Sequence, residues 1–258
     1  MSGSGPLLEV AALSVRAGAL QLLEGLSMQV EPGEFIAILG RNGCGKSLTL
    51  HTLAGLRPAL AGEVWLGGIA LAALKRRAIA RHLGLLPQDR EEALGLTTLE
   101  TVLTGRHPHL RLWERESAAD RALAAHSLER FGVARHAERP LAGLSGGEQR
   151  RAAMAALLAQ APRVYLLDEP TNHLDPHHQL EVLQIFRSLA DAGAAVIATL
   201  HDPTLAERFA DRVLLMHGDG RWQLGAASEL LNAASLSALY LTPMTELRAP
   251  GRRAFIPA

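Results

Sequence analysis

The sequence predicts an α/β fold, in which helices cover a mainly parallel sheet and a helical segment is inserted into the core. Two observations support this prediction. Short apolar runs alternate with helical patterns along most of the chain. Several of these runs, such as FIAIL and AAVIATL, lack the polar–apolar alternation of a half-exposed strand. Strands buried on both faces have this composition, which is typical of parallel sheets between layers of helices.

The apolar runs are expected to be strands because they are short and bounded by turn residues. These runs are Leu8–Val15, Leu26–Val30, Phe35–Leu39, Glu63–Leu66, Leu83–Leu86, Val164–Leu167, Ala194–Leu200 and Val213–His217. Helical patterns cover Lys46–Leu56, Ser117–Phe131, Gly146–Gln160, Pro176–Ala192, Pro203–Ala210 and Ala227–Leu231. Asp175 and Asp202 each precede a proline, the order expected for an N-cap acid and the first helical position. Ser145-x-x-Glu148 has the spacing of a capping box.

The stretch Asp89–Ala161 breaks the strand–helix alternation, because it contains helical patterns and loops without a convincing strand. We therefore expect a single domain whose α/β core is formed by residues 1–88 and 162–258. Residues 89–161 would form a helical subdomain within it. A length of 258 residues suits this organisation.

Composition and charge restrict the function. Basic and acidic residues balance at 26 each, which argues against a nucleic-acid binder held by charge. Cys44 is the single cysteine, so an intrachain disulfide is excluded and a reducing compartment is favoured. No apolar run approaches the roughly 18 residues needed to span a membrane, and Met1–Pro6 lacks the features of a secretory signal. We expect a cytoplasmic protein, which remains free to dock on a membrane protein.

Gly40–Ser47 reads GRNGCGKS and matches the phosphate-loop pattern G-x-x-x-x-G-K-[ST]. An expected strand precedes it and a helical pattern follows it, so a chance match in an ordinary turn is disfavoured. Glycines let successive backbone N–H groups point at phosphates, and the helix N-terminus adds positive potential. We expect Lys46 to reach the β- and γ-phosphates of ATP and the Ser47 hydroxyl to ligate Mg²⁺.

The candidate nucleotide-binding residues of this segment are Gly40, Arg41, Asn42, Gly43, Cys44, Gly45, Lys46, Ser47 and Leu48. Since Cys44 lies inside the loop, we also hypothesise that oxidation or alkylation of its thiol would block nucleotide binding.

An acidic pair ends the apolar run at Val164–Glu169, VYLLDE. By itself such a pair is usually a strand that meets a polar turn. Downstream of a phosphate loop, a carboxylate at the end of a core strand can hold Mg²⁺, the role assigned to Asp168. Glu169 is then placed to orient and deprotonate the attacking water.

LSGGEQ at Leu144–Gln149 suggests a second anion cradle, because a capped helix start carries two glycines that cost helix propensity. Together with GRNGCGKS and VYLLDEP, it resembles the signature of ABC ATPases. The resemblance covers about Leu8–Tyr240. It implies a P-loop NTPase (RecA-like) core with a mixed, mainly parallel sheet, an N-terminal antiparallel β subdomain and an inserted α-helical subdomain.

The resemblance also implies that Ser145, Gly146, Gly147 and Glu148 face the γ-phosphate bound by a partner subunit. It therefore implies a head-to-tail homodimer, or a pair of such subunits, with two ATP molecules at the interface.

Three further positions match family motifs one by one. Gln88, in LLPQ, matches the Q-loop glutamine, which contacts Mg²⁺ and water and senses the membrane partner. Asp175, in NHLD, matches the D-loop aspartate that shapes the dimer interface. His201 matches the switch histidine at the γ-phosphate, and it ends an apolar run, at the sheet edge where α/β proteins bind ligands.

One feature of the family is missing. An aromatic residue that stacks on adenine usually precedes the phosphate loop, but the corresponding region here reads LSVRAGALQ. Arg16 is the candidate substitute, since a guanidinium can stack on a base. Weaker base selectivity is the expected result.

Thr98–Leu112 reads TLETVLTGRHPHLRL. ABC subunits of iron-siderophore, haem and vitamin B12 importers carry a similar stretch, and LPQ and SALYLTPM also resemble that group. The resemblance implies transmembrane permease subunits as partners and a periplasmic or extracellular substrate-binding protein as an indirect one. The place of action would be the cytoplasmic face of the inner membrane.

Other functions remain open at this point. The Thr98–Leu112 stretch is alternatively a solvated loop without partner information. The protein could also serve an importer of an unrelated small solute. A soluble single-cassette ATPase, as in iron–sulfur cluster assembly, would need no permease. A ribosome-acting ABC protein would usually carry two cassettes and a basic linker. A DNA-repair ATPase would need a long heptad insertion, for which the roughly 100 residues between the phosphate loop and the signature leave no room.

Overall fold

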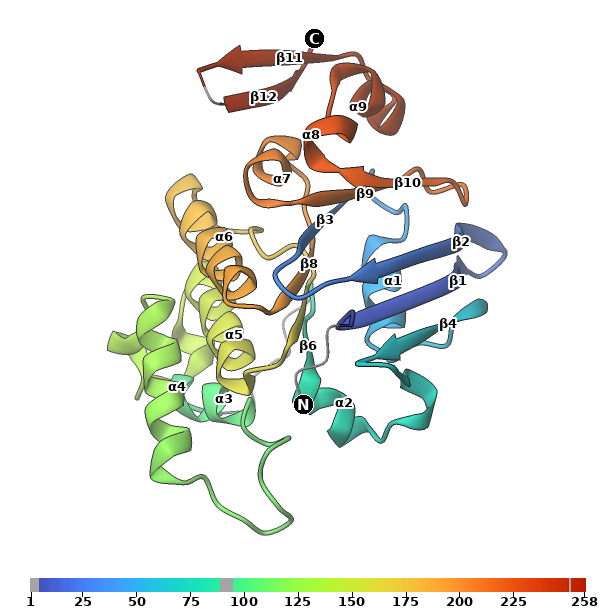
Figure 1. Cartoon of the computed structure of the whole chain (residues 1–258). Helices are drawn as coiled ribbons and strands as arrows, with labels where there is room; N and C mark the ends of the chain where they lie inside the picture. The colour runs from blue at the N-terminus through green and yellow to red at the C-terminus, as the bar shows by residue number, and fades with distance from the viewer. Residues whose placement is uncertain (1–4, 89–94, 251) are drawn as a thin grey trace.

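The centre of the molecule is a six-stranded sheet in the order β10-β9-β3-β8-β7-β6 (Figure 1). The structure is a computed structural model that describes residues 5–88, 95–250 and 252–258. The strands are β3 (Phe35–Leu39), β6 (Leu83–Leu86), β7 (Val164–Leu167), β8 (Ala195–Thr199), β9 (Arg212–Met216) and β10 (Trp222–Ala226). The first five are parallel, and β10 pairs antiparallel with β9. The expectation of a mixed, mainly parallel sheet is confirmed.

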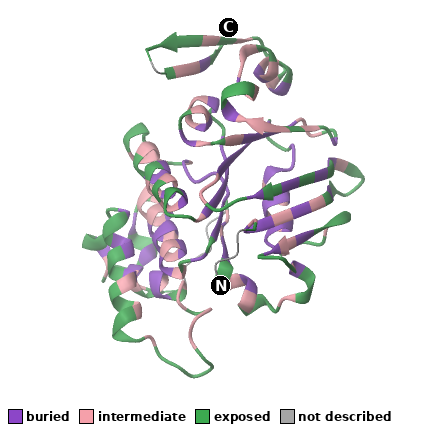
Figure 2. Cartoon of the chain, in the orientation of Figure 1, coloured by how far each residue is buried: buried purple, intermediate pink, exposed green. Residues whose placement is uncertain are grey.

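Side chains from both faces of this sheet are buried, which explains its continuous apolar strands. On β3, Phe35, Ala37 and Leu39 pack into a core with helices on one side. Ile36 and Ile38 pack into a second core on the other side. Strands with two buried faces cannot alternate polar and apolar residues. Figure 2 shows this buried centre between exposed outer surfaces.

A second sheet is antiparallel and has the order β2-β1-β4-β5. Its strands are β1 (Leu8–Ala17), β2 (Leu20–Val30), β4 (Ala61–Leu66) and β5 (Ile69–Ala70). Together with α1 (Lys46–Leu53) it covers one face of the central sheet (Figure 1). The expected N-terminal antiparallel β region is therefore present.

Helices α6 (Pro176–Asp191) and α7 (Pro203–Phe209) cover the opposite face (Figure 1). Both begin at the expected acids: Asp175 accepts a hydrogen bond from the His178 N–H at 3.0 Å, and Asp202 accepts one from the Thr204 N–H at 2.7 Å. These bonds satisfy backbone donors that the first helical turn leaves unpaired.

Between β6 and β7 the described residues form helices and turns. The helices are α3 (Thr98–Thr104), α4 (Ala118–Arg130) and α5 (Gly146–Gln160), with short 3₁₀ turns at Ala134–His136 and Leu141–Gly143. They lie together on one side of the molecule (Figure 1). The expected boundary at Asp89 and the residues Met1–Ser4 lie outside the described residues.

Several elements were not expected from sequence. They are β5, β10, a 3₁₀ turn at Leu71–Ala73, α2 (Arg76–His82), α3, α9 (Ala233–Tyr240) and the C-terminal hairpin of β11 (Met244–Ala249) and β12 (Arg252–Pro257). α8 (Ala227–Leu230) was expected. Most of the unexpected elements are short, so they span too few residues to show a clear hydrophobic periodicity. Among the described residues, no helix is both long and apolar enough to cross a bilayer.

Candidate nucleotide-binding site

A cavity of about 590 Å³ opens where the parallel strands of the central sheet end. It is lined by Asn42, Gly43, Gly45, Lys46, Ser47, Leu48, Gln88, Glu169, Asn172 and His201. These residues follow β3, β6, β7 and β8, which are distant in sequence. Parallel strands bring their carboxyl ends to one edge, and this is where α/β sheets bind ligands. The structure thus brings nine of the eighteen residues assigned to the site from the sequence into one cavity.

The loop between β3 and α1 has a backbone that requires glycine. Gly43 and Gly45 have φ of 78° and 100°, which side-chain-bearing residues rarely adopt. A Cβ on Gly40 would lie 2.5 Å from the Met216 carbonyl oxygen, and one on Gly45 would lie 2.8 Å from Leu22. The glycines therefore provide both the turn and the close packing beneath it.

Lys46 and Ser47 begin α1 at the floor of the cavity. Lys46 is buried, and its Nζ donates to the carbonyls of Gly40 at 2.9 Å and Arg41 at 3.3 Å. Its ammonium group is thereby held within the curl of the loop. The Ser47 hydroxyl donates to Gln88 Oε1 at 3.4 Å, which joins the loop to the end of β6.

Asp168 directly follows β7 and is fully buried. Its Oδ1 accepts a hydrogen bond from the Thr199 hydroxyl at 2.8 Å, while Oδ2 has no hydrogen-bond partner among the described residues. A buried carboxylate oxygen without a donor is costly unless a cation satisfies it. Oxygen atoms from Asp168, Ser47 and Gln88 suit Mg²⁺, which binds through one or two carboxylates and otherwise keeps waters or phosphates. These residues fit the expected ion.

Glu169 is held by three side chains. Its Oε1 lies 2.7 Å from His201 Nε2, and its Oε2 accepts from Gln88 Nε2 at 3.0 Å and from the Asn172 amide. Its φ is 48°, a strained value for a residue with a side chain. Its backbone N–H donates to Thr199 Oγ1 at 2.7 Å. The carboxylate is therefore oriented toward the histidine, the glutamine and the cavity.

Thr199 is one of the residues here that sequence reasoning missed. It ends β8, is fully buried, and links the backbone of Glu169 to the carboxylate of Asp168. The available signal was a polar residue near the end of the apolar run AAVIATL, two positions before His201.

Three of the expected loop residues, Gly40, Arg41 and Cys44, are not among the residues that line the cavity. Arg41 does not line the cavity; its guanidinium donates to the His217 carbonyl at 3.4 Å. The Cys44 side chain is buried in the apolar core, not exposed to the cavity, and burial raises the pKa of its thiol. Its backbone N–H donates to Arg41 O at 3.2 Å. The thiol is therefore not positioned for the proposed chemical block of the nucleotide.

The LSGGEQ segment starts α5 and lies outside the cavity. Its capping box is formed: Glu148 Oε2 accepts from the Ser145 N–H at 3.0 Å and from its hydroxyl at 2.8 Å. These bonds hold the pKa of Glu148 at about 2. His136 Nε2 lies 2.9 Å from the other carboxylate oxygen.

Gly147 follows in the first turn of this helix, and a Cβ there would lie 3.3 Å from the His173 carbonyl oxygen. The signature therefore contacts the segment that leads to Asp175 within one chain. Asp175 is exposed and caps α6, and His178 lowers its pKa through a backbone and a side-chain hydrogen bond.

Arg16 does not line the cavity. It lies near the end of β1, is exposed and pairs in register with Gln21 of β2. Among the described residues, the Arg16 guanidinium makes no contact with a residue that lines the cavity.

The Thr98–Leu112 stretch is ordered by its own motif residues. A Cβ on Gly105 would lie 2.1 Å from the Ala156 carbonyl, so only glycine allows this approach to α5. Arg106 forms an ion pair with Asp120 at 2.7 Å, and His109 Nε2 lies 2.9 Å from the Gln160 carbonyl. These three residues therefore make internal contacts, while contact of the stretch with a partner stays a prediction. Beyond them, Leu112 and Trp113 are 81% and 93% exposed.

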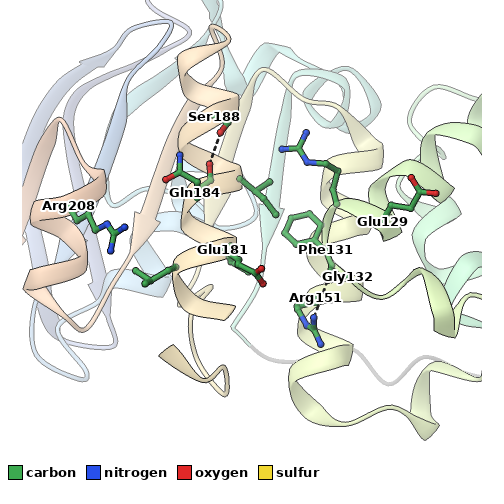
Figure 3. Close-up of a pocket in the computed structure, with 12 residues that line it drawn as sticks. Glu129, Phe131, Gly132, Arg151, Glu181, Gln184, Ser188 and Arg208 are labelled. Carbon is green, nitrogen blue, oxygen red and sulfur yellow. Dashed lines mark hydrogen bonds between the residues drawn. The ribbon is translucent and has the colours of Figure 1, made fainter. Parts of the chain in front are cut away.

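A separate cavity of about 540 Å³ lies where the inserted helices meet α6. Figure 3 shows Phe131, Gly132 and Arg151 on one side of it and Glu181, Gln184 and Ser188 on the other. None of the predicted site residues lines it. The predicted chemistry therefore belongs to the cavity at the strand ends.

Comparison with known proteins agrees with this geometry. Residues 23–172 match the ABC transporter family. The chain is 43% identical to the hemin import ATP-binding protein HmuV of Gloeobacter violaceus, over 83% of this chain and 80% of that protein. It is 35% identical to the iron(3+)-hydroxamate import ATP-binding protein FhuC of Bacillus subtilis, over 88% of this chain and 85% of that protein.

Another relative is longer. The ABC transporter ATP-binding protein YvrA of Bacillus subtilis is 37% identical over 91% of this chain, which spans 54% of that protein. Among solved structures, an ABC transporter in an inward-facing conformation, assigned to the metal-chelate type, superimposes with a TM-score of 0.85 at 26% identity. The match covers 98% of both chains.

Proposed function

The chain belongs to the ABC transporter family as an ATP-hydrolysing subunit, and from this premise we propose the importer that it serves. The cargo would be an iron–siderophore, haem or cobalamin-type compound, carried through a separate membrane permease. One observation chiefly supports the mechanism: Lys46, Gln88, Glu169 and His201 line one cavity, while the signature at Ser145 lies outside it.

In the proposed mechanism, ATP binds with its phosphates against the loop Gly40–Ser47. Lys46 reaches the β- and γ-phosphates from the floor of the cavity, and the loop N–H groups and the start of α1 attract the same charge. Ser47, Gln88 and Asp168 would hold Mg²⁺, which neutralises phosphate charge when bound.

Glu169 would orient and deprotonate the attacking water, and His201 would contact the γ-phosphate. The hydrogen bonds from Gln88 and Asn172 to the Glu169 carboxylate support this role, because they fix the position of the base. The exposed imidazole of His201 lies 2.7 Å from the same carboxylate, so the group proposed to contact the γ-phosphate lies beside the proposed base.

The signature would complete the site of a second subunit. Ser145, Gly146, Gly147 and Glu148 do not line the cavity of their own chain, so a head-to-tail homodimer is needed to bring them to a nucleotide. Asp175, on the segment packed against Gly147, would lie at the same interface. Closure around two ATP molecules, followed by hydrolysis, would drive the transport cycle.

The permease would contact the Thr98–Leu112 region, including the exposed Leu112 at its end, and the exposed Trp113 that follows it. A rigid base supports this proposal: the Pro108 carbonyl accepts hydrogen bonds from Arg77 at 3.0 Å and Arg81 at 2.8 Å, both on α2. The subunit would act at the cytoplasmic face of the inner membrane, with a periplasmic or extracellular substrate-binding protein as an indirect partner.

The direct test is Glu169→Gln. We expect this variant to bind ATP normally, to lose hydrolysis by about 10²–10⁴-fold, and to accumulate as an ATP-dependent dimer. Phosphate release and size-exclusion chromatography with ATP and Mg²⁺ measure both effects, with ADP as the control nucleotide. Hydrolysis at the wild-type rate would contradict the role of Glu169.

Co-purification separates the importer from a permease-free ATPase of the same family. Expressed with its neighbouring genes, the chain should be recovered from detergent extracts with a polytopic membrane protein. Recovery only in a complex without a membrane protein would contradict the importer and favour the permease-free alternative.

A further inference from the structure

Arg150 is a buried cation that connects three segments of the site. It lies on α5 directly after the LSGGEQ motif and is 4% exposed. Its guanidinium donates to the carbonyls of Pro87 and Gln88, the latter at 3.4 Å, at the end of β6. It also donates to the carbonyls of Asp168 and Glu169, the latter at 3.1 Å, at the end of β7.

These contacts are directional. An arginine side chain carries five N–H donors in a planar fork, and burying it is costly unless acceptors surround it. The acceptors here are backbone carbonyls of the residues that present the site's key side chains. A shift of the guanidinium would therefore move the backbone that carries Gln88, Asp168 and Glu169. Sequence reasoning assigned Arg150 no role.

The adjacent Arg151 shows that this is not a general property of the helix. Arg151 lies about 100° further around α5. Its guanidinium donates to the Phe131 carbonyl at 3.3 Å, beside the separate cavity (Figure 3). The two arginines therefore contact different parts of the molecule. Arg151 connects α5 to the end of α4, and Arg150 connects α5 to the ends of β6 and β7.

The start of α5 adds the mechanical link. Ser145 and Gly147 stand within two turns of Arg150 on one helix, whose cap is fixed by Glu148. A helix of this length moves as a rigid body, so displacement of its N-terminus is transmitted to Arg150. Glu169, on which the guanidinium acts, has the strained φ of 48°.

We propose that Arg150 is a positioning residue that couples the signature helix to the catalytic groups of its own subunit. Engagement of the signature with the partner's nucleotide sets the position of α5. Through Arg150, that position sets the backbone of Gln88, Asp168 and Glu169. This inference rests on the proposed dimer of ATPase subunits. It assigns no contact between Arg150 and the nucleotide.

The test is Arg150→Lys, which keeps the charge but replaces the planar fork with a single ammonium group. We expect kcat for ATP to fall about ten- to a hundredfold, because charge-assisted hydrogen bonds that place Glu169 are lost. KM should change by no more than about threefold, since Lys46 and the loop are untouched. Arg130→Lys, the same substitution at an exposed arginine of α4, is the matched control and should retain wild-type kcat.

A second measurement excludes a merely structural role. In the Glu169→Gln background, Arg150→Lys should still form the ATP-dependent dimer, and its thermal midpoint without nucleotide should match that of the parent. A joint loss of stability, ATP affinity and kcat would overturn the proposal, because Arg150 would then only support the fold. Unchanged kcat in Arg150→Lys would also overturn it.

The dimeric ATPase and the coupling through Arg150 are tested by separate variants. If the wild-type chain neither hydrolyses ATP nor dimerises as Glu169→Gln, the proposed function is wrong. If it does both while Arg150→Lys keeps its kcat, only the coupling through Arg150 is wrong.

Discussion

Individual side chains of this protein have roles that depend on which side of the backbone they face. Within one loop, the ammonium group of Lys46 faces the cavity while the Cys44 thiol packs into the core. The two residues are two positions apart in sequence, yet one is a cation at the cavity and the other a neutral thiol in the core. Lys46 borders the cavity proposed to hold the phosphates, whereas Cys44 behaves as a small apolar residue.

Cys44 gives a prediction at this scale. Burial raises the pKa of its thiol above the usual value of 9.0, so the native protein holds less reactive thiolate than the unfolded chain at pH 8. We expect a thiol reagent to label the native protein at least about tenfold more slowly than the protein in urea. A reagent that releases a coloured thiolate on reaction lets absorbance measure the labelling rate in both states. Equal rates would contradict the buried position of the thiol.

The capping boxes at the starts of α4 and α5 are alike in structure, but only the one on α5 lies in the signature. α4 and α5 both begin with a complete capping box, Ser117–Asp120 and Ser145–Glu148. The hydrogen bonds lower the pKa of both acids to about 2. α4 lies away from the cavity, while α5 carries the signature. The two helices therefore form a natural pair in which the cap's stabilising effect is separated from its functional effect.

We expect removal of either cap to destabilise the fold, but only removal of the α5 cap to impair dimerisation. Ser145→Ala and Ser117→Ala should each lower the free energy of unfolding by about 1 kcal/mol, as measured by urea titration. Only Ser145→Ala should weaken ATP-dependent dimerisation in the Glu169→Gln background. Equal effects of both substitutions on dimerisation would show that the signature serine acts only as a helix cap.

The pH dependence of these caps has a defined sign. Glu148 and Asp120 have a lower pKa in the folded protein than the ordinary 4.5 and 3.8, so their contribution is complete above those values. It is lost as the pH falls from there toward about 2. The stability difference between wild type and either alanine variant should shrink over that interval.

At the scale of the whole molecule, the separation between the cavity and the signature is the feature that supports the proposed partner subunit. The cavity collects residues from four strand ends, yet the helix start with two glycines lies outside it. A head-to-tail arrangement of two copies would place each signature on the other's nucleotide. The active unit would then be a pair of composite sites.

Mixing two inactive variants tests this arrangement. A Lys46→Ala subunit paired with a Ser145→Arg subunit retains one of its two composite sites intact, so the isolated heterodimer should hydrolyse ATP at up to about half of the wild-type rate. The control pairs wild type with the double variant, which carries the same substitutions but leaves no intact site. Equal hydrolysis by the two heterodimers, isolated with distinct affinity tags, would contradict composite sites.

Much of the site could be predicted from sequence because its motifs are local. GRNGCGKS, VYLLDE and LSGGEQ each carry their chemistry within a few residues, and the capping spacing of Ser145 and Glu148 directly predicted the observed hydrogen bonds. The buried strands β3, β6 and β7 were predicted to the residue, since their length and apolar composition are set by burial on both faces.

The remaining features depend on contacts between distant residues. The hydroxyl of Thr199 meets Asp168 across two neighbouring strands, and the guanidinium of Arg150 reaches carbonyls 62 and 18 residues away in sequence. Neither residue type signals such a partner by itself. The direction of Cys44 was likewise set by the packing of the loop against Gly218, where a Cβ would lie 2.9 Å from Cys44.

By itself, the sequence of this protein determined its family, the parallel core and the identity of the nucleotide-binding motifs, because these rest on short-range patterns of glycine, charge and apolar residues. Only the tertiary structure decided which of those residues share a cavity and which face the core. It also placed the signature away from the phosphate loop of its own chain. The physical reason is that strand order and helix packing, not chain separation, set the distances between side chains.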